Sequence, residues 1–147
     1  MTLEEYRDFF LKLPASELGV LELRNYGPRV SLIVHRVPPF QVELVNWGPN
    51  VVVPAHRHPN IDAFEVFVDG GLFLAVGATE KITNAFIRRG KIMPESRLRE
   101  FPPMRVCQKD WHGGKAGEHG ASFWSIQEWS AGSKMTAARL DWEGPEI

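Results

Sequence analysis

The segment HRHPNIDAFEVFVDGG, residues 56–71, places two of the chain's five histidines one residue apart, just before an apolar run that ends in Gly-Gly. In an extended strand, residues i and i+2 point to the same face and lie about 6–7 Å apart. Histidine nitrogens bind zinc and similar ions at about 2.0–2.2 Å, so His56 and His58 can reach a single ion. The spacing therefore predicts a metal-binding pair beside a strand.

Further candidate ligands follow this pair. Glu65 shares a strand face with Ala63 and Phe67, and a carboxylate inside a small barrel is costly unless it is paired or bound to a metal. Asp62 lies closer to the turn and is a second acidic candidate, although aspartate also favours turns. Far along the chain, His112 is followed by two glycines, which would let the backbone pass close to a bound group.

Patterns of period two, broken by glycine and proline, predict short strands along most of the chain. The expected strands span residues 29–37, 40–47, 51–54, 64–68, 72–76, 104–108 and 121–129. Residues 2–13 are the one clear helix, with Thr2 as its N-cap and Pro14 at its end. The charged stretch 78–103 is expected to form a long loop, or a short helix and a loop. This order of elements predicts an all-β sandwich or barrel.

The length and composition limit what the protein can be. A chain of 147 residues predicts a single domain, residues 1–147, with a barrel over about residues 29–130 and a C-terminal tail packed by Trp142. A net charge of −1 argues against a nucleic-acid or anionic-membrane partner. Cys107 is the single cysteine, which excludes an intrachain disulfide and favours a reducing compartment. With no recognisable signal peptide, we expect a cytoplasmic protein.

These residues resemble the motifs of the cupin superfamily. Its first motif runs, in outline, Gly, a short gap, His-x-His, three or four residues, Glu, six residues and Gly. Here Gly48 precedes residues 56–58, and Gly70-Gly71 closes the segment. The second motif supplies one further histidine, and residues 110–113, DWHG, are similar to it. The resemblance covers about residues 40–130 and implies a double-stranded β-helix, or jelly-roll barrel.

Two departures from the cupin pattern concern the site. With a gap of four residues after His58 the acid position holds Ala63, and with a gap of three it holds Asp62. Glu65 follows one rung further on, on the same face as Ala63. No proline-glycine turn precedes His112. We expect the metal ligands to be His56, His58, Glu65 and His112, with Asp62 as the alternative to Glu65.

The cupin resemblance implies a divalent metal ion in the barrel, which could be Fe, Mn, Ni or Zn. It also implies a small-molecule ligand, because the superfamily includes dioxygenases, isomerases, decarboxylases, sugar-binding regulators and storage proteins. We expect a metal-dependent enzyme of the dioxygenase, isomerase or lyase type that acts on a small polar metabolite. The alternative is a non-catalytic, ligand-binding cupin with a degenerate metal site.

Two further expectations concern the pocket and the assembly. Four aromatic side chains could line the pocket or could pack in the core: Phe67, Phe73, Trp111 and Trp124. Small cupins often pair, so we expect a homodimer that uses the N-terminal helix or an edge strand at its interface.

Overall fold

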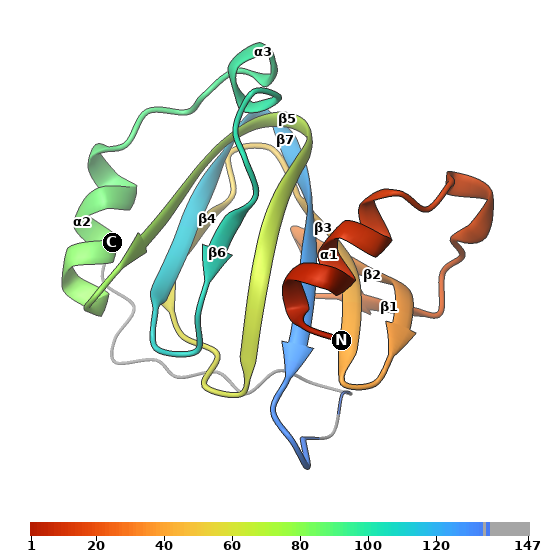
Figure 1. The fold of residues 1–147 in the computed structure, drawn as a ribbon. Helices are drawn as coiled ribbons and strands as arrows, with labels where there is room; N and C mark the ends of the chain where they lie inside the picture. Colours follow the sequence, from red (N-terminus) through yellow and green to blue (C-terminus); the bar gives the residue numbers. More distant parts are fainter. Residues whose placement is uncertain (134, 136–147) are drawn as a thin grey trace.

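Residues 1–133 fold into one curled, antiparallel β-sheet with three α-helices outside it (Figure 1). The computed structural model describes residues 1–133 and residue 135. The helices are α1 (Leu3–Leu11), the short 3-10 helix η1 (Ala15–Glu17), α2 (Glu80–Arg89) and α3 (Glu95–Leu98). The strands are β1 (Glu22–Asn25), β2 (Arg29–Val37), β3 (Phe40–Trp47), β4 (Val52–His56), β5 (Ile61–Gly77), β6 (Met104–Val106) and β7 (Trp111–Trp129).

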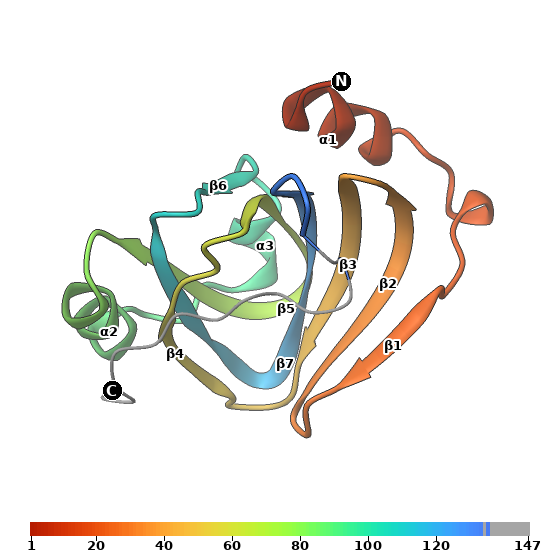
Figure 2. The ribbon, with the colours of Figure 1, turned by 90° about the horizontal axis from the view of Figure 1, so that it is seen from below.

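The strand order explains how the sheet encloses a barrel. The order is β1-β2-β3-β7-β5-β6, and β4 pairs with another part of β7. Seen from below, β1, β2 and β3 form one wall, and β4, β5 and β6 lie on the opposite side (Figure 2). The long strand β7 joins the two sides because it pairs with β3 near its C-terminal end and with β4 near its N-terminal end.

The strands β5 and β7 are longer than the sequence pattern predicts. Residues 64–68 and 72–76 belong to one strand, which is bent by register shifts between Phe67 and Asp69 and between Gly70 and Leu72. Gly70 has a φ of +87°, and a Cβ there would collide with the carbonyl oxygen of Gly120, whose φ is +80°. Glycine at both positions lets the strands bend without a break.

The N-terminal helix forms as predicted and packs on the outer face of the sheet. Thr2 and Glu5 make the reciprocal hydrogen bonds of a capping box. Phe10 packs edge-on against Trp124 of β7, with ring centroids 5.1 Å apart. The hydroxyl of Tyr6 is hydrogen-bonded to Nδ1 of His35 at 2.6 Å, so His35 has a structural role beside α1.

Residues 78–103 contain two helices, α2 and α3, where the sequence pattern left open a loop or a single short helix. Thr79 caps α2 by accepting a hydrogen bond from the Ile82 N–H. The inner face of α2 buries Ile87 against Ala55 of β4 and Ala75 of β5. Within the described residues, no helix is long and apolar enough to cross a membrane. The expected tail around Trp142 lies outside the described residues.

Candidate metal centre

Three histidines converge inside the barrel from two neighbouring strands. His56 ends β4, His58 follows it, and His112 lies near the start of β7, directly opposite His56 in the strand register. The ligand nitrogens of the three side chains all lie within 4.8 Å of one another. The ring centroids are 4.4 Å apart for His56 and His112, 4.8 Å for His56 and His58, and 5.2 Å for His58 and His112. The structure therefore brings together the histidines that the sequence singled out.

Backbone carbonyls orient two of the three rings. Nδ1 of His56 donates a hydrogen bond to the Pro54 carbonyl at 2.8 Å, and Nδ1 of His112 donates to the Asp110 carbonyl at 3.5 Å. A hydrogen bond from one ring nitrogen to a carbonyl fixes the tautomer of a metal-binding histidine. These two contacts select Nε2 of His56 and His112 as the nitrogens that would bind an ion.

Burial keeps the rings of His56 and His112 neutral. Burial lowers the pKa of His56 to about 4, helped by the neighbouring His58 and by the positive charge of Arg29, while its hydrogen bond to Pro54 acts in the opposite direction. Burial also lowers the pKa of His112 well below its ordinary value, with further contributions from His56 and His58. A metal binds the neutral imidazole, so both histidines are ready to bind at neutral pH.

The donor set fits a divalent transition-metal ion. Three imidazoles that meet at one point suit zinc, iron, nickel or copper, and three protein ligands leave positions open for other molecules. The structure thus supports a possible metal site formed by His56, His58 and His112.

The three histidines lie in the wall of a cavity of about 850 Å³. Tyr26, Trp47 and Phe123 line it with aromatic rings, and Glu65, Ser125 and Gln127 are among its polar groups. A mixed lining and a volume of this size are typical of sites for small organic molecules.

Glu65 lies in this cavity but outside the histidine cluster. Its Oε1 is 3.5 Å from the hydroxyl of Ser125, and its Oε2 is buried without a hydrogen-bond partner in the described residues. Burial raises the pKa of Glu65 to about 8; the Ser125 hydrogen bond lowers it, and the nearby Glu43 carboxyl raises it. The structure does not place a Glu65 oxygen in the group of mutually close ligand atoms, so its role as a metal ligand stays a prediction.

Asp62 faces away from the cavity. Its carboxylate accepts hydrogen bonds from the backbone N–H of Gln108 at 3.1 Å and from the Gln108 side chain at 3.3 Å. Ala63, the next residue, lines the cavity instead. Asp62 therefore lies in β5 and ties it to the turn after β6, and its role as the alternative metal ligand stays a prediction.

The four aromatic residues that could line the pocket or pack in the core do not line this cavity. Trp124 contacts Phe10 of α1, and Trp111 lies with Ile87 under α2. Phe73 also packs in the cluster under α2. Phe67 lies beneath the Arg99 guanidinium beside α3. On β7 the alternation explains this, because Phe123, Ser125 and Gln127 face the cavity and Trp124 must face outward.

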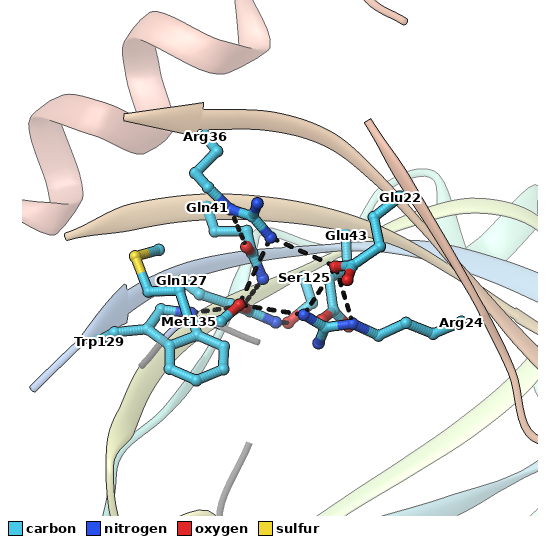
Figure 3. A network of polar contacts seen from close by, with 9 residues as sticks. All are labelled: Glu22, Arg24, Arg36, Gln41, Glu43, Ser125, Gln127, Trp129 and Met135. Carbon is cyan, nitrogen blue, oxygen red and sulfur yellow. Dashed lines mark hydrogen bonds and ion pairs between the residues drawn. The ribbon is translucent and has the colours of Figure 1, made fainter. Parts of the chain in front are cut away.

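A network of polar side chains lies along β1, β2, β3 and β7 (Figure 3). Its centre is the nearly buried Arg24, which pairs with Glu22 at 2.9 Å and with Glu43 at 3.0 Å. Gln127 donates to the Ser125 hydroxyl at 3.1 Å and accepts from the Trp129 indole at 2.9 Å. Arg24, Glu43, Ser125 and Gln127 also line the cavity. Sequence reasoning missed this network, because its members come from separate strands and show no local motif.

Comparisons with known proteins support the fold. No protein-family model matches the chain, and no curated protein matches it in sequence. KdgF from Halomonas sp. superposes on 73% of this chain and 86% of its own, with 16% identity and a TM-score of 0.54. An uncharacterized Klebsiella pneumoniae protein with a double-stranded β-helix domain superposes over 97% of this chain and 96% of its own, with 14% identity and a TM-score of 0.53. An RmlC-like cupin from Shewanella frigidimarina covers 82% and 91%, with 10% identity and a TM-score of 0.54. The chain therefore has the double-stranded β-helix fold of the cupin superfamily, as the sequence resemblance predicted.

Proposed function

We propose that this protein binds one divalent metal ion through His56, His58 and His112 and uses it in a reaction on a small polar molecule. The reaction would be of the dioxygenase, isomerase or lyase type. The single observation that carries this proposal is the convergence of three imidazoles on one point in the wall of a cavity of about 850 Å³.

The residues around the site suit this role. A divalent ion at the three histidines would supply a Lewis acid for a carbonyl or enediol oxygen, and iron would also permit chemistry with dioxygen. Trp47 and Phe123 would exclude water from the bound molecule. Glu65 and Ser125 would form hydrogen bonds with its polar groups in the same cavity. The chain thus offers metal binding, shielding and orientation together.

One observation favours the second candidate, a non-catalytic cupin that only binds a ligand. The acid position of the cupin motif holds Ala63, and Glu65 lies outside the histidine cluster. A site that lacks its carboxylate ligand could retain the barrel and the cavity without turnover. Homodimer formation and a cytoplasmic location also stay predictions.

The two candidates differ in what happens to a ligand. The metal-loaded protein and a chelated sample are each incubated with a mixture of small polar metabolites, and the mixture is followed by mass spectrometry. The enzyme proposal expects one metabolite to be converted only by the metal-loaded protein. His56→Ala should abolish conversion, and His119→Ala should leave it intact, because the His119 side chain is 87% exposed. If the protein instead holds a metabolite without converting it, both with metal and after chelation, the result would support the binding candidate and contradict the enzyme proposal.

A further inference from the structure

The cavity wall contains two arginines in different electrostatic situations. Arg24 is neutralised by Glu22 and Glu43, at 2.9 and 3.0 Å. Arg29, the first residue of β2, also lines the cavity, and no carboxylate of residues 1–133 forms an ion pair with it. Arg24 therefore has its counter-charge within the protein, and Arg29 has a charge available to a bound molecule.

Arg29 is the exposed first residue of β2 and lines the same cavity as the metal centre. It is opposite Trp47 in the register of β2 and β3, and both residues line the cavity with His56. A molecule held at the three histidines would therefore share this cavity with the Arg29 guanidinium.

Among residues 1–133, the carboxyl groups that line the cavity are those of Glu43 and Glu65, and Glu65 lies outside the histidine cluster with its pKa raised by burial. All three histidine ligands are uncharged when they bind a metal. Ala63 replaces the carboxylate that the cupin motif expects. Glu43 is already paired with Arg24. A divalent ion together with Arg29 would make this part of the cavity strongly positive, and such a site attracts anions.

We infer that the ligand of the proposed metal centre is a small, oxygen-chelating organic anion, whose carboxylate is bound by the ion and by Arg29 together. This inference rests on the proposed function and specifies the ligand class. The planar guanidinium of arginine matches a carboxylate in shape and charge. The buried, unpartnered Oε2 of Glu65 adds a hydrogen-bonding group in the same cavity, so the ligand carries polar groups beyond its carboxylate.

The test compares an anion with its neutral analogue on the Co²⁺-loaded protein. Glycolate and glycolamide differ mainly in charge, and binding of either to the ion changes the visible absorption of Co²⁺. The parent protein should bind glycolate more tightly than glycolamide. Arg29→Gln should weaken glycolate binding by at least about tenfold, the scale of a charge-assisted hydrogen bond, with little effect on glycolamide. Arg89→Gln is the matched control, because Arg89 is exposed on α2 and does not line the cavity.

The outcomes separate this inference from the proposed function. A Co²⁺-loaded parent that binds glycolamide as well as glycolate, or binds neither, would overturn the anion assignment alone. Equal glycolate affinity in the parent and Arg29→Gln, at equal Co²⁺ content, would overturn the role of Arg29. A parent protein that holds no Co²⁺ would overturn both the proposed function and the inference.

Discussion

His56 and His112 are directly opposite each other in the register of β4 and β7, and their ring centroids lie 4.4 Å apart. The metal centre therefore depends on the position of β4, a short strand whose ladder with β7 is interrupted between Val53 and His56. At this interruption the N–H of Ala55 donates a hydrogen bond of 2.8 Å to the side-chain oxygen of Asn84 in α2. Helix α2 thus supplies a contact that the strand ladder lacks.

Replacement of Asn84 should weaken both the fold and the metal site. Asn84→Ala leaves the buried N–H of Ala55 without its acceptor, which should cost about 1–3 kcal/mol of unfolding free energy. We also expect metal affinity to fall about tenfold, as when an outer group that positions a ligand is removed. Urea unfolding and a metal titration measure the two effects. Lys81→Ala, on the exposed face of α2, is the control, and unchanged metal affinity in Asn84→Ala would contradict the positioning role.

The burial of His56 predicts an acid-dependent loss of stability in the metal-free protein. The folded pKa is about 4, below the unfolded value of 6.5, so the unfolded state takes up the proton first as the pH falls. The contribution of His56 is complete above pH 6.5 and is lost as the pH falls toward 4, by on the order of 2–3 kcal/mol. The difference in unfolding free energy between the parent and His56→Gln should follow this curve. The control is His119→Gln, at an exposed histidine, and it should keep the parent's pH dependence of stability. If His56→Gln also kept it, the acid-dependent loss of stability would not come from His56.

The burial of Glu65 predicts a stability that falls as the pH rises, which is opposite to the effect of His56. Its folded pKa of about 8 lies above the ordinary value of 4.5, so its contribution is complete below pH 4.5 and is lost as the pH rises to 8. The loss is on the order of a few kcal/mol. Metal-free Glu65→Gln should therefore be more stable than the parent at pH 8, with a smaller gain at pH 5, as measured by urea unfolding. A pH-independent difference would show that Glu65 does not titrate in this way.

The Glu65→Gln variant also tests the predicted ligand role. A fourth ligand would be expected to contribute strongly to metal affinity, whereas a cavity residue outside the coordination sphere would not. Because the three histidines form the close cluster without Glu65, we expect the affinity to change by less than about tenfold. Complete loss of metal in Glu65→Gln, with the fold retained, would restore Glu65 as the ligand.

Ala63 offers the complementary experiment. It lines the cavity at the position where the cupin motif has its acid, so Ala63→Glu should place a carboxylate near the histidines. We expect zinc affinity to rise by at least about tenfold, measured by competition with a chromophoric chelator. Ala63→Gln has a similar size without the charge and should give a smaller gain. Equal affinities in the parent and both variants would mean that this position does not reach the ion.

The sequence could predict the barrel and the three histidines because both depend on local patterns. Alternation marks strands, and the His-x-His spacing places two rings on one face of the chain. His112 was a candidate because two glycines follow it, and the cupin resemblance strengthened that assignment; the pairing of β4 with β7 is what brings it to His56. The continuous strands β5 and β7 were missed because Gly70 and Gly120 look like turn residues but occupy bends.

The cavity lining was harder to predict, because it depends on which strand face turns inward. Trp124 and Phe123 are adjacent, and only the three-dimensional arrangement shows that Phe123 faces the cavity while Trp124 meets α1. The pairing of Arg24 with Glu43 joins two strands that are not neighbours in the sheet. No local pattern in the sequence distinguishes Arg29 from Arg24.

The central claim is that three histidines hold one metal ion, and elemental analysis tests it most directly. The purified, untagged parent would be reconstituted and analysed beside His56→Ala, His112→Ala and the exposed-histidine control His119→Ala, with circular dichroism to verify the fold. We predict about one divalent ion per chain in the parent and in His119→Ala. The other two variants should be folded and metal-free. A parent that holds no metal after reconstitution, or equal metal in all four proteins, would contradict the account.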